Sequence, residues 1–407
     1  GKTWTKLTDG VNGIPANHFV RVVREDPEQK GLLYAGTEFG LYVSFSDGAS
    51  WRPLQLNLPV TPITDLAVKR GDLVVATQGR SFWILDDLTV LHQLSEDVAN
   101  AEHHLFTPRT VVRWIDQSGG GGRGTVGQNP PFGATIHYTL PEGLDEEDAD
   151  EVKLDLLDAE GEVLRSLSSQ TPEKRAPSPW RQMFPELFDP PLLDARAGAN
   201  RYVWNLALPD AGLVDDAVVW GFPGGPTVPP GSYQARLTVG EWSETVSFDV
   251  VQDPRLQVTQ EEAEAKYELA KAIWEELTRS HEAISRIRDI RGQVTSIAER
   301  VDDEAVTEKA EEIGEALTGI EKKLNQVKNE SSQDVLNFPP QIDNQLIYLQ
   351  GIVEATLGAP LQSSIDRFAE LEIELDGYLA ELDAVVKQIP EFEELLGEKQ
   401  SQRIFVE

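Results

Sequence analysis

Residues 32–51, LLYAGTEFGLYVSFSDGASW, constrain the fold of this chain more than any other stretch. Two short runs rich in β-branched and aromatic residues are punctuated by Gly36 and Gly40, a pattern typical of paired strands. Small polar residues follow with the spacing S-x-S-x-G-x-S-W, which ends on Trp51. Hydroxyl groups bind the backbone of a tight turn, and a Trp packs apolar surface beside it. The stretch therefore predicts a β-hairpin closed by a polar turn and anchored by a tryptophan.

A second copy of this pattern lies at the start of the chain. Gly1, Thr3 and Trp4 fit its last four positions, G-x-T-W, and the step from position 4 to position 51 is 47 residues. Such a period is expected for one four-stranded unit of a repeated β-architecture. The chain does not begin with Met, so we expect it to be the C-terminal part of a longer protein whose earlier repeats lie outside it.

The repeated turn resembles the Asp-box (BNR) motif, S-x-D-x-G-x-T-W, which lies between the outer strands of β-propeller blades. Ser46 stands where the family has its Asp, with Asp47 next to it, and this departure argues against a cation site. The resemblance implies a structural turn whose glycine adopts a conformation closed to other residues. The residues that carry the match are Ser44, Ser46, Asp47, Gly48, Ser50 and Trp51.

Three further runs are similar to the C-terminal half of large bacterial proteins with sortilin-like (VPS10-type) β-propellers, which are often labelled glycosyl hydrolases. They are DLVVATQGRSFWILDD (72–87), FTPRTVVRW (106–114) and NPPFGATIHY (129–138). The resemblance implies an extracytoplasmic protein, either periplasmic, secreted or on the cell surface. The hydrolase label rests on the likeness of these propellers to sialidases, and a shared fold does not establish a shared activity.

Residues 1–106 predict eight short strands in two groups of four, which we interpret as the last blades of a β-propeller. A propeller needs at least about four blades, so these two would close a ring only with upstream blades. The strands expected in the first group are 17–25, 32–37, 39–45 and 51–57, and those in the second are 63–69, 72–77, 81–85 and 90–94.

The middle of the chain predicts a linker followed by a second β-domain. Residues 107–131 contain a run of four glycines and are expected to be a Gly/Pro-rich linker. Within 132–253, short alternating strands and hairpin turns at Gly161 and Gly240 favour an immunoglobulin- or fibronectin-like β-sandwich. The prolines of 168–197 predict an irregular insertion that lies across this sandwich.

From residue 256 to 407 the apolar period becomes helical. Thr259 and Glu262 form a capping-box pattern before a helix of about 40 residues, roughly 60 Å long. Narrow apolar seams with charged flanks predict an antiparallel helical bundle, so the whole chain is expected to be a multidomain β + α protein. The other expected helices are 306–327, 342–353 and 365–389.

The chain is strongly acidic, with 69 acidic and 36 basic residues and a net charge of −33. Phosphate binding needs an excess of Lys and Arg, so nucleic acid is not an expected partner. The sequence contains no run of about 18 apolar residues, so we expect no membrane span. Cys is absent, which excludes disulfides and thiolate chemistry. Salt screens a surface of this kind, which is consistent with a high-salt habitat.

A sialidase-like site needs an Arg cluster, a Tyr nucleophile with its Glu, and an acidic proton donor. No spacing singles out such a set, and no H-x-x-x-H metal pattern occurs. The acidic run at 145–151 lacks the residue order of a Ca²⁺ loop, and His281 falls on an apolar helix seam, as expected of a core histidine. We therefore expect no catalytic residue, metal or cofactor here. The residues of sialidase type in the first domain are Arg21, Arg24, Arg80, Tyr34, Tyr42, Glu38 and Asp65.

Aromatic residues in the Pro/Gly-rich loops of the predicted sandwich are candidates for a platform that binds a sugar or a peptide. The alternative is that they pin long loops to the sandwich, as partly buried aromatic residues commonly do. The candidates are Trp180, Phe184, Trp220 and Phe222.

Two functions from different classes fit these predictions. The first is a non-catalytic C-terminal region that binds a protein or a glycan and assembles with the upstream blades. The second is the support region of a BNR-type glycoside hydrolase whose active site lies in those blades. A peptidase-associated accessory region is a third option, based only on the kinds of domain that occur together in this chain. The lack of a convergent set of titratable groups favours the first.

Overall fold

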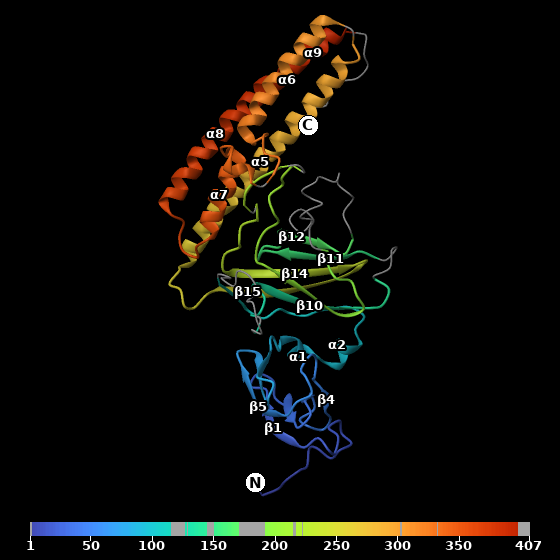
Figure 1. Cartoon of the computed structure of the whole chain (residues 1–407). Helices are drawn as coiled ribbons and strands as arrows, with labels where there is room; N and C mark the ends of the chain where they lie inside the picture. Colours follow the sequence, from blue (N-terminus) through green and yellow to red (C-terminus); the bar gives the residue numbers. More distant parts are fainter. Residues whose placement is uncertain are drawn as a thin grey trace.

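Three parts follow one another along an elongated molecule in the computed structural model (Figure 1). A small β-rich part lies at the N-terminal end, a larger part made of two sheets lies in the middle, and helices form the other end. The prediction of a mixed β and α chain is thus confirmed. The structure describes residues 2–114, 127, 129–144, 150–170, 192–214, 217–221, 223–301, 303–331 and 333–397.

The first sheet is an antiparallel meander in sequence order, and apolar residues cover both of its faces. One face, with Tyr34, packs against the second sheet. The other face, with Tyr42, packs against Ile14 and Trp51. The two central strands are buried along their whole length as a result. The strands are β1 (Val20–Glu25), β2 (Leu33–Thr37), β3 (Leu41–Ser44) and β4 (Arg52–Pro53).

The second sheet has three antiparallel strands, β5 (Ile63–Lys69), β6 (Asp72–Thr77) and β7 (Phe82–Leu85). It packs closely on the first sheet, because a Cβ atom at Gly36 would lie 2.5 Å from a methyl group of Ile63. The approach of the two sheets therefore requires glycine at this position.

The fourth strand predicted for this group, at 90–94, is wrong. The structure has a short helix there, α1 (Thr89–Gln93), followed by α2 (Glu96–Asn100). The carboxylate of Asp87 accepts hydrogen bonds from the backbone and the hydroxyl of Thr89, which favours a helical turn at this point. The helical turn also lets His92 reach back to the first sheet.

The middle part consists of two sheets that share one core around Trp204, Tyr138 and Leu237. One sheet has the order β13 (Gly198–Trp204), β10 (Ala134–Leu140) and β8 (His104–Leu105). The other has the order β12 (Val163–Ser168), β11 (Val152–Leu157), β14 (Gly231–Val239), β15 (Trp242–Gln252) and β9 (Val111–Arg113).

Strand β9 corrects the predicted linker at 107–131. Its residues pair in parallel with the end of β15, so this piece of the expected linker is an edge strand of a sheet. The glycine run, residues 145–149 of the acidic run and residues 171–191 of the predicted insertion lie outside the described residues.

Five helices at the C-terminal end pack around a single apolar core. The capping box of Thr259 and Glu262 is present at the start of the longest one, which has 39 residues. The last predicted helix, 365–389, corresponds to α8, and a further short helix that was not predicted follows it with Pro390 in its first turn. The helices are α5 (Gln260–Ala298), α6 (Glu304–Leu324), α7 (Ile342–Glu354), α8 (Gln362–Val386) and α9 (Ile389–Leu396), with a 3₁₀ turn η1 (Asp334–Leu336) between α6 and α7.

Buried charges lie at the seam where the helices meet the two sheets. Lys266 on α5 is 1% exposed, and its ammonium group lies 3.2 Å from the carboxylate of Glu354 on α7. Arg113 on β9 is also 1% exposed, and its guanidinium has no hydrogen-bond partner among the described residues. Burial lowers the pKa of Arg113, and the charge of Glu354 opposes this shift. The carboxylate of Glu354 therefore offsets the charge of two buried cations, Lys266 and Arg113.

We expect Glu354→Gln to destabilise the chain by about 3–5 kcal/mol, because it leaves two buried cations without an anion. Urea unfolding followed by circular dichroism measures the change. Glu370→Gln is the control, since Glu370 is exposed and pairs with Arg367 on the helix surface. An unchanged midpoint for Glu354→Gln would contradict the role given to this carboxylate.

Candidate functional site

The turn that resembles an Asp-box is held by its own hydroxyl groups. The buried Ser44 hydroxyl accepts hydrogen bonds from the backbone of Gly48 at 3.0 Å and of Ser46 at 3.3 Å. The Ser46 hydroxyl accepts a bond from the backbone of Ser50 at 3.0 Å. Gly48 has a φ of +83° and Asp47 a φ of +53°, so the turn uses the left-handed region twice. These bonds let the hydroxyl groups of the turn hold its own backbone.

The same turn anchors the segment that precedes the first sheet. The indole nitrogen of Trp51 donates to the carbonyl of Leu7 at 3.0 Å. The side-chain amide of Asn12 donates to Leu7 at 2.6 Å, and the backbone of Trp51 donates to the Asn12 carbonyl at 2.8 Å. The motif therefore fixes residues 7–14 over one face of the first sheet.

We predict that Ser44→Ala destabilises the first sheet by about 1–3 kcal/mol, because two backbone N–H groups lose a buried acceptor. Ser50→Ala, at an exposed position of the same turn, is expected to cost much less. Hydrogen exchange at β2 and β3 distinguishes the two variants. Equal exchange rates in both would argue against the Ser44 hydroxyl as the organising group.

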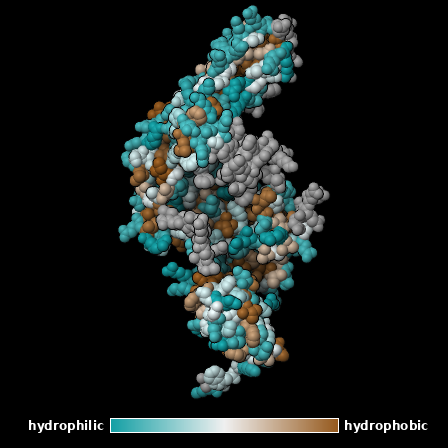
Figure 2. Space-filling model, in the orientation of Figure 1, coloured by the Kyte–Doolittle hydropathy of each residue, from teal (hydrophilic) through white to brown (hydrophobic). Residues whose placement is uncertain are grey.

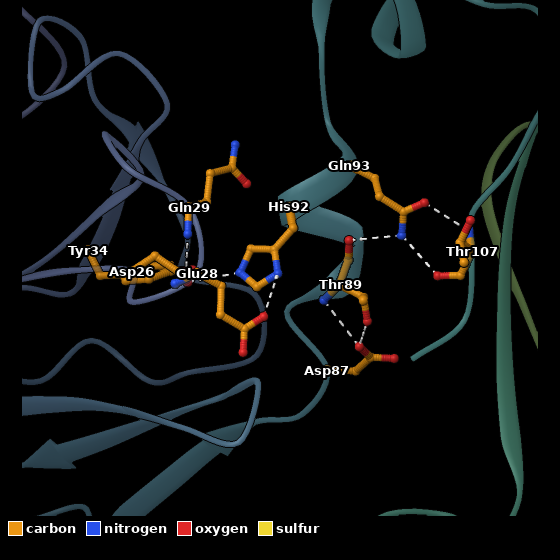
Figure 3. A network of polar contacts seen from close by, with 9 residues as sticks. All are labelled: Asp26, Glu28, Gln29, Tyr34, Asp87, Thr89, His92, Gln93 and Thr107. Carbon is orange, nitrogen blue, oxygen red and sulfur yellow. Dashed lines mark hydrogen bonds and ion pairs between the residues drawn. The ribbon is translucent and has the colours of Figure 1, made fainter. Parts of the chain in front are cut away.

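A polar network links the first sheet to α1 (Figure 3). The side chain of Asp26 is fully buried, and its Oδ2 accepts hydrogen bonds from the Tyr34 hydroxyl at 2.8 Å and from His92 Nε2 at 2.9 Å. Its Oδ1 accepts the backbone N–H of Glu28 and of Gln29. Burial would raise the pKa of Asp26, but these hydrogen bonds outweigh it and lower the pKa below its ordinary value.

The network continues from α1 toward the two-sheet part. Gln93 exchanges two hydrogen bonds with the backbone of Thr107, at 2.9 and 2.8 Å. Close by, Arg109 pairs with Asp72 on β6 at 2.8 Å. Among the described residues, the hydroxyl group bonded to Asp26 is that of Tyr34, and it is buried. These contacts join the first sheet to α1, and α1 and the second sheet to the segment that leads into the two-sheet part.

We expect Asp26→Asn to cost about 1–3 kcal/mol at neutral pH, because the new amide group would face two hydrogen-bond donors. The contribution of Asp26 is present above its ordinary pKa of 3.8 and is lost as the pH falls through its lower folded value. The difference in unfolding free energy between the two proteins should therefore shrink below about pH 4. A constant difference down to pH 2 would be the contradictory result.

The residues of sialidase type do not converge. Arg21 pairs with Glu38 and Arg24 pairs with Asp65, each at 2.5 Å. Both tyrosines are buried and donate or accept hydrogen bonds elsewhere. Arg80 lies in the turn before β7, where its backbone contacts Thr77. In the described part of the chain, no group of three or more His, Asp or Glu residues is arranged to hold a metal ion.

Of the four residues of the predicted aromatic platform, only Trp220 is among the described residues. Trp180, Phe184 and Phe222 lie outside the described residues. Trp220 is 44% exposed, and its backbone exchanges two hydrogen bonds with the side chain of Asn344 on α7, at 2.9 and 2.8 Å. Its loop is thus fixed to the helices.

Sequence reasoning missed an apolar face on the second sheet. Register pairing places Val74 beside Ile84, and Ala76 beside Phe82, on the face turned away from the first sheet. Phe82 is 73% exposed and Ile84 is 58% exposed. Figure 2 shows apolar patches on this N-terminal part between hydrophilic areas. The alternation of β6 and β7 could have shown that both faces of this sheet are apolar.

No protein-family model matches this chain, and no curated protein matches it significantly. The Asp-box and sortilin-like resemblances therefore stay predictions that rest on the residues quoted for them. No described helix has both the length and the apolar character needed to cross a membrane.

Proposed function

We propose that this chain is a non-catalytic binding and assembly region of an extracytoplasmic β-propeller protein. Residues up to about 106 would be two neighbouring blades, and the two-sheet part, an immunoglobulin- or fibronectin-like sandwich, would join them to the helical end. The partner on the blade side is a further blade of the same protein. The helices and the sandwich loops would present surfaces to a protein or a glycan.

The observation that carries this proposal is an apolar patch on the outer face of the second sheet, where the exposed Phe82 and Ile84 lie beside the half-buried Ala76 and Val74. Apolar patches of this kind often mark an interaction site. The first sheet has the same apolar character on both faces, and both are covered. A second β-sheet is therefore the occupant that matches the uncovered face best.

A repeated blade fits this face for a further reason. The first and second sheets already pack face to face, with Ile63 of β5 against Gly36 of β2. In a propeller, every blade packs against two neighbours in this manner. The step of 47 residues between the two Trp positions supports the same interpretation. The hydrolase alternative concerns blades outside this chain, and the paired arginines described above give it no support here.

The proposal predicts that Phe82→Asp destabilises one version of the protein and hardly affects another. In this chain alone the residue is exposed, so the change should alter stability by no more than about 0.5 kcal/mol. In a version extended upstream with further repeats, the residue would be buried, and the change should cost about 2 kcal/mol or more. Thermal or urea unfolding of both versions measures the difference.

Leu336→Asp is the matched control, because Leu336 is 81% exposed but lies in the helical part. It should have little effect in either version. Two results would sink the proposal: the same small effect of Phe82→Asp in both versions, or an upstream gene sequence without Asp-box repeats.

A further inference from the structure

Strand β7 lies at an edge of the second sheet. It pairs with β6 on one side, and in the described part of the chain no strand pairs with its other side. The backbone N–H of Thr77 donates to the carbonyl of Ser81 at 3.2 Å, so the next pair, Ala76 and Phe82, has backbone groups that point away from each other. The same holds two residues later for Ile84. The N–H and C=O groups of Phe82 and Ile84 therefore point to the open edge.

The composition of β7 differs from that of the other edge strands. Its four residues, Phe-Trp-Ile-Leu, are all apolar. Each of the other edge strands in the described sheets contains a charged residue or a histidine; these strands are β1, β4, β5, β8, β9, β12 and β13. Charged side chains on an edge strand oppose its pairing with a further strand. Strand β7 lacks this protection, so its edge is suited to pairing.

A second copy of β7 fits this edge in an antiparallel register centred on Trp83. In that register Phe82 of each copy lies opposite Ile84 of the other, so the outward N–H and C=O groups of both residues are satisfied. Their side chains also meet across the pair, on the same face of the sheet. The edge is therefore complementary to itself.

The charges at the two ends of β7 are complementary in the same register. Arg80 lies three residues before Trp83 and Asp86 lies three residues after it, so Arg80 of each copy comes opposite Asp86 of the other. Both residues are exposed. Two chains with a net charge of −33 repel each other over most of their surface, and opposite charges meet at this contact. This match favours a second copy over a strand of unrelated sequence.

We propose that two copies of this chain associate through β7 and join their second sheets into one continuous antiparallel sheet. A two-fold contact of this kind uses the open β7 edge of both copies, so association stops at the dimer. The other edge of the sheet, β5, packs beside β1 and carries Asp65 and Lys69. The inference does not depend on the proposed function, because it requires only residues of this chain and leaves the outer face of the sheet open.

Sedimentation equilibrium of the full chain at constant ionic strength tests the proposal. The average mass should rise from 45.1 kDa toward twice that value between about 1 and 200 µM protein, because a small contact associates weakly. Ile84→Pro removes an outward N–H but no bond to β6, and it should weaken association by about tenfold or more. Val60→Asp is the control, because Val60 is 74% exposed in the same part of the chain but lies outside β7. It should leave association unchanged.

Arg80→Glu and Asp86→Lys test the register and the identity of the partner. Each change alone should weaken association by about threefold or more, because like charges then meet across the contact. The double variant exchanges the two charges and should restore the association. Both side chains are exposed, so these variants test the proposal even if Ile84→Pro fails to fold.

Several outcomes would overturn the proposal. One is the mass of a single chain at every concentration, and another is a mass that grows beyond two chains. Unchanged association of a folded Ile84→Pro protein would show that β7 is not the contact. A double charge variant that associates no more strongly than the single ones would exclude the antiparallel register with a second copy.

Discussion

The first two sheets carry apolar residues on both faces, and the architecture of the N-terminal part depends on how these faces are covered. The first sheet is covered by the second sheet on one side and by the segment around Ile14 on the other. In the middle part, two sheets cover each other. Within the described residues, the second sheet has a partner on one side only, and Phe82 and Ile84 are exposed. This imbalance is the strongest structural reason to expect further chain of the same kind beside it.

The distribution of charge gives a second view of the molecule. The chain has nearly twice as many acidic as basic residues, yet several basic residues lie at the contacts between its parts. Arg113 and Lys266 are buried at the seam between sheets and helices, and Arg291 joins α5 to α6 through Glu321. Arg109 connects the second sheet to the segment that leads into β9. Basic residues thus lie near carboxylates from other elements at the places where the parts of this acidic chain meet.

Local patterns predicted the elements that depend on local chemistry. The strands at 63–69 and 72–77 have the predicted bounds, and the capping box at Thr259 starts the long helix as expected. The strand predicted at 90–94 is wrong because Asp87 initiates a helical turn that the apolar pattern does not reveal. Strand β9 was hidden because its three residues gain order only from pairing with β15, well over a hundred residues later.

The candidate sites also divide into those that depend on local contacts and those that depend on contacts between distant residues. The hydroxyl groups of the polar turn could be assigned from spacing alone, since all of their partners lie within four residues. The cluster of Arg288 and Arg291 around Glu321 could not, because the two arginines look like an ordinary charged helix face in the sequence. Their shared carboxylate, Glu321, comes from another helix.

Helix α5 begins beside the two sheets and extends to the far end of the molecule (Figure 1). With 39 residues at 1.5 Å each, it is about 58 Å long. Along this length it bonds to the loops of the two-sheet part at two points, through Trp274 to the carbonyl of Pro209 and through His281 to the backbone of Val214. These contacts, together with the pair of Lys266 and Glu354, set the direction in which the helices extend from the sheets.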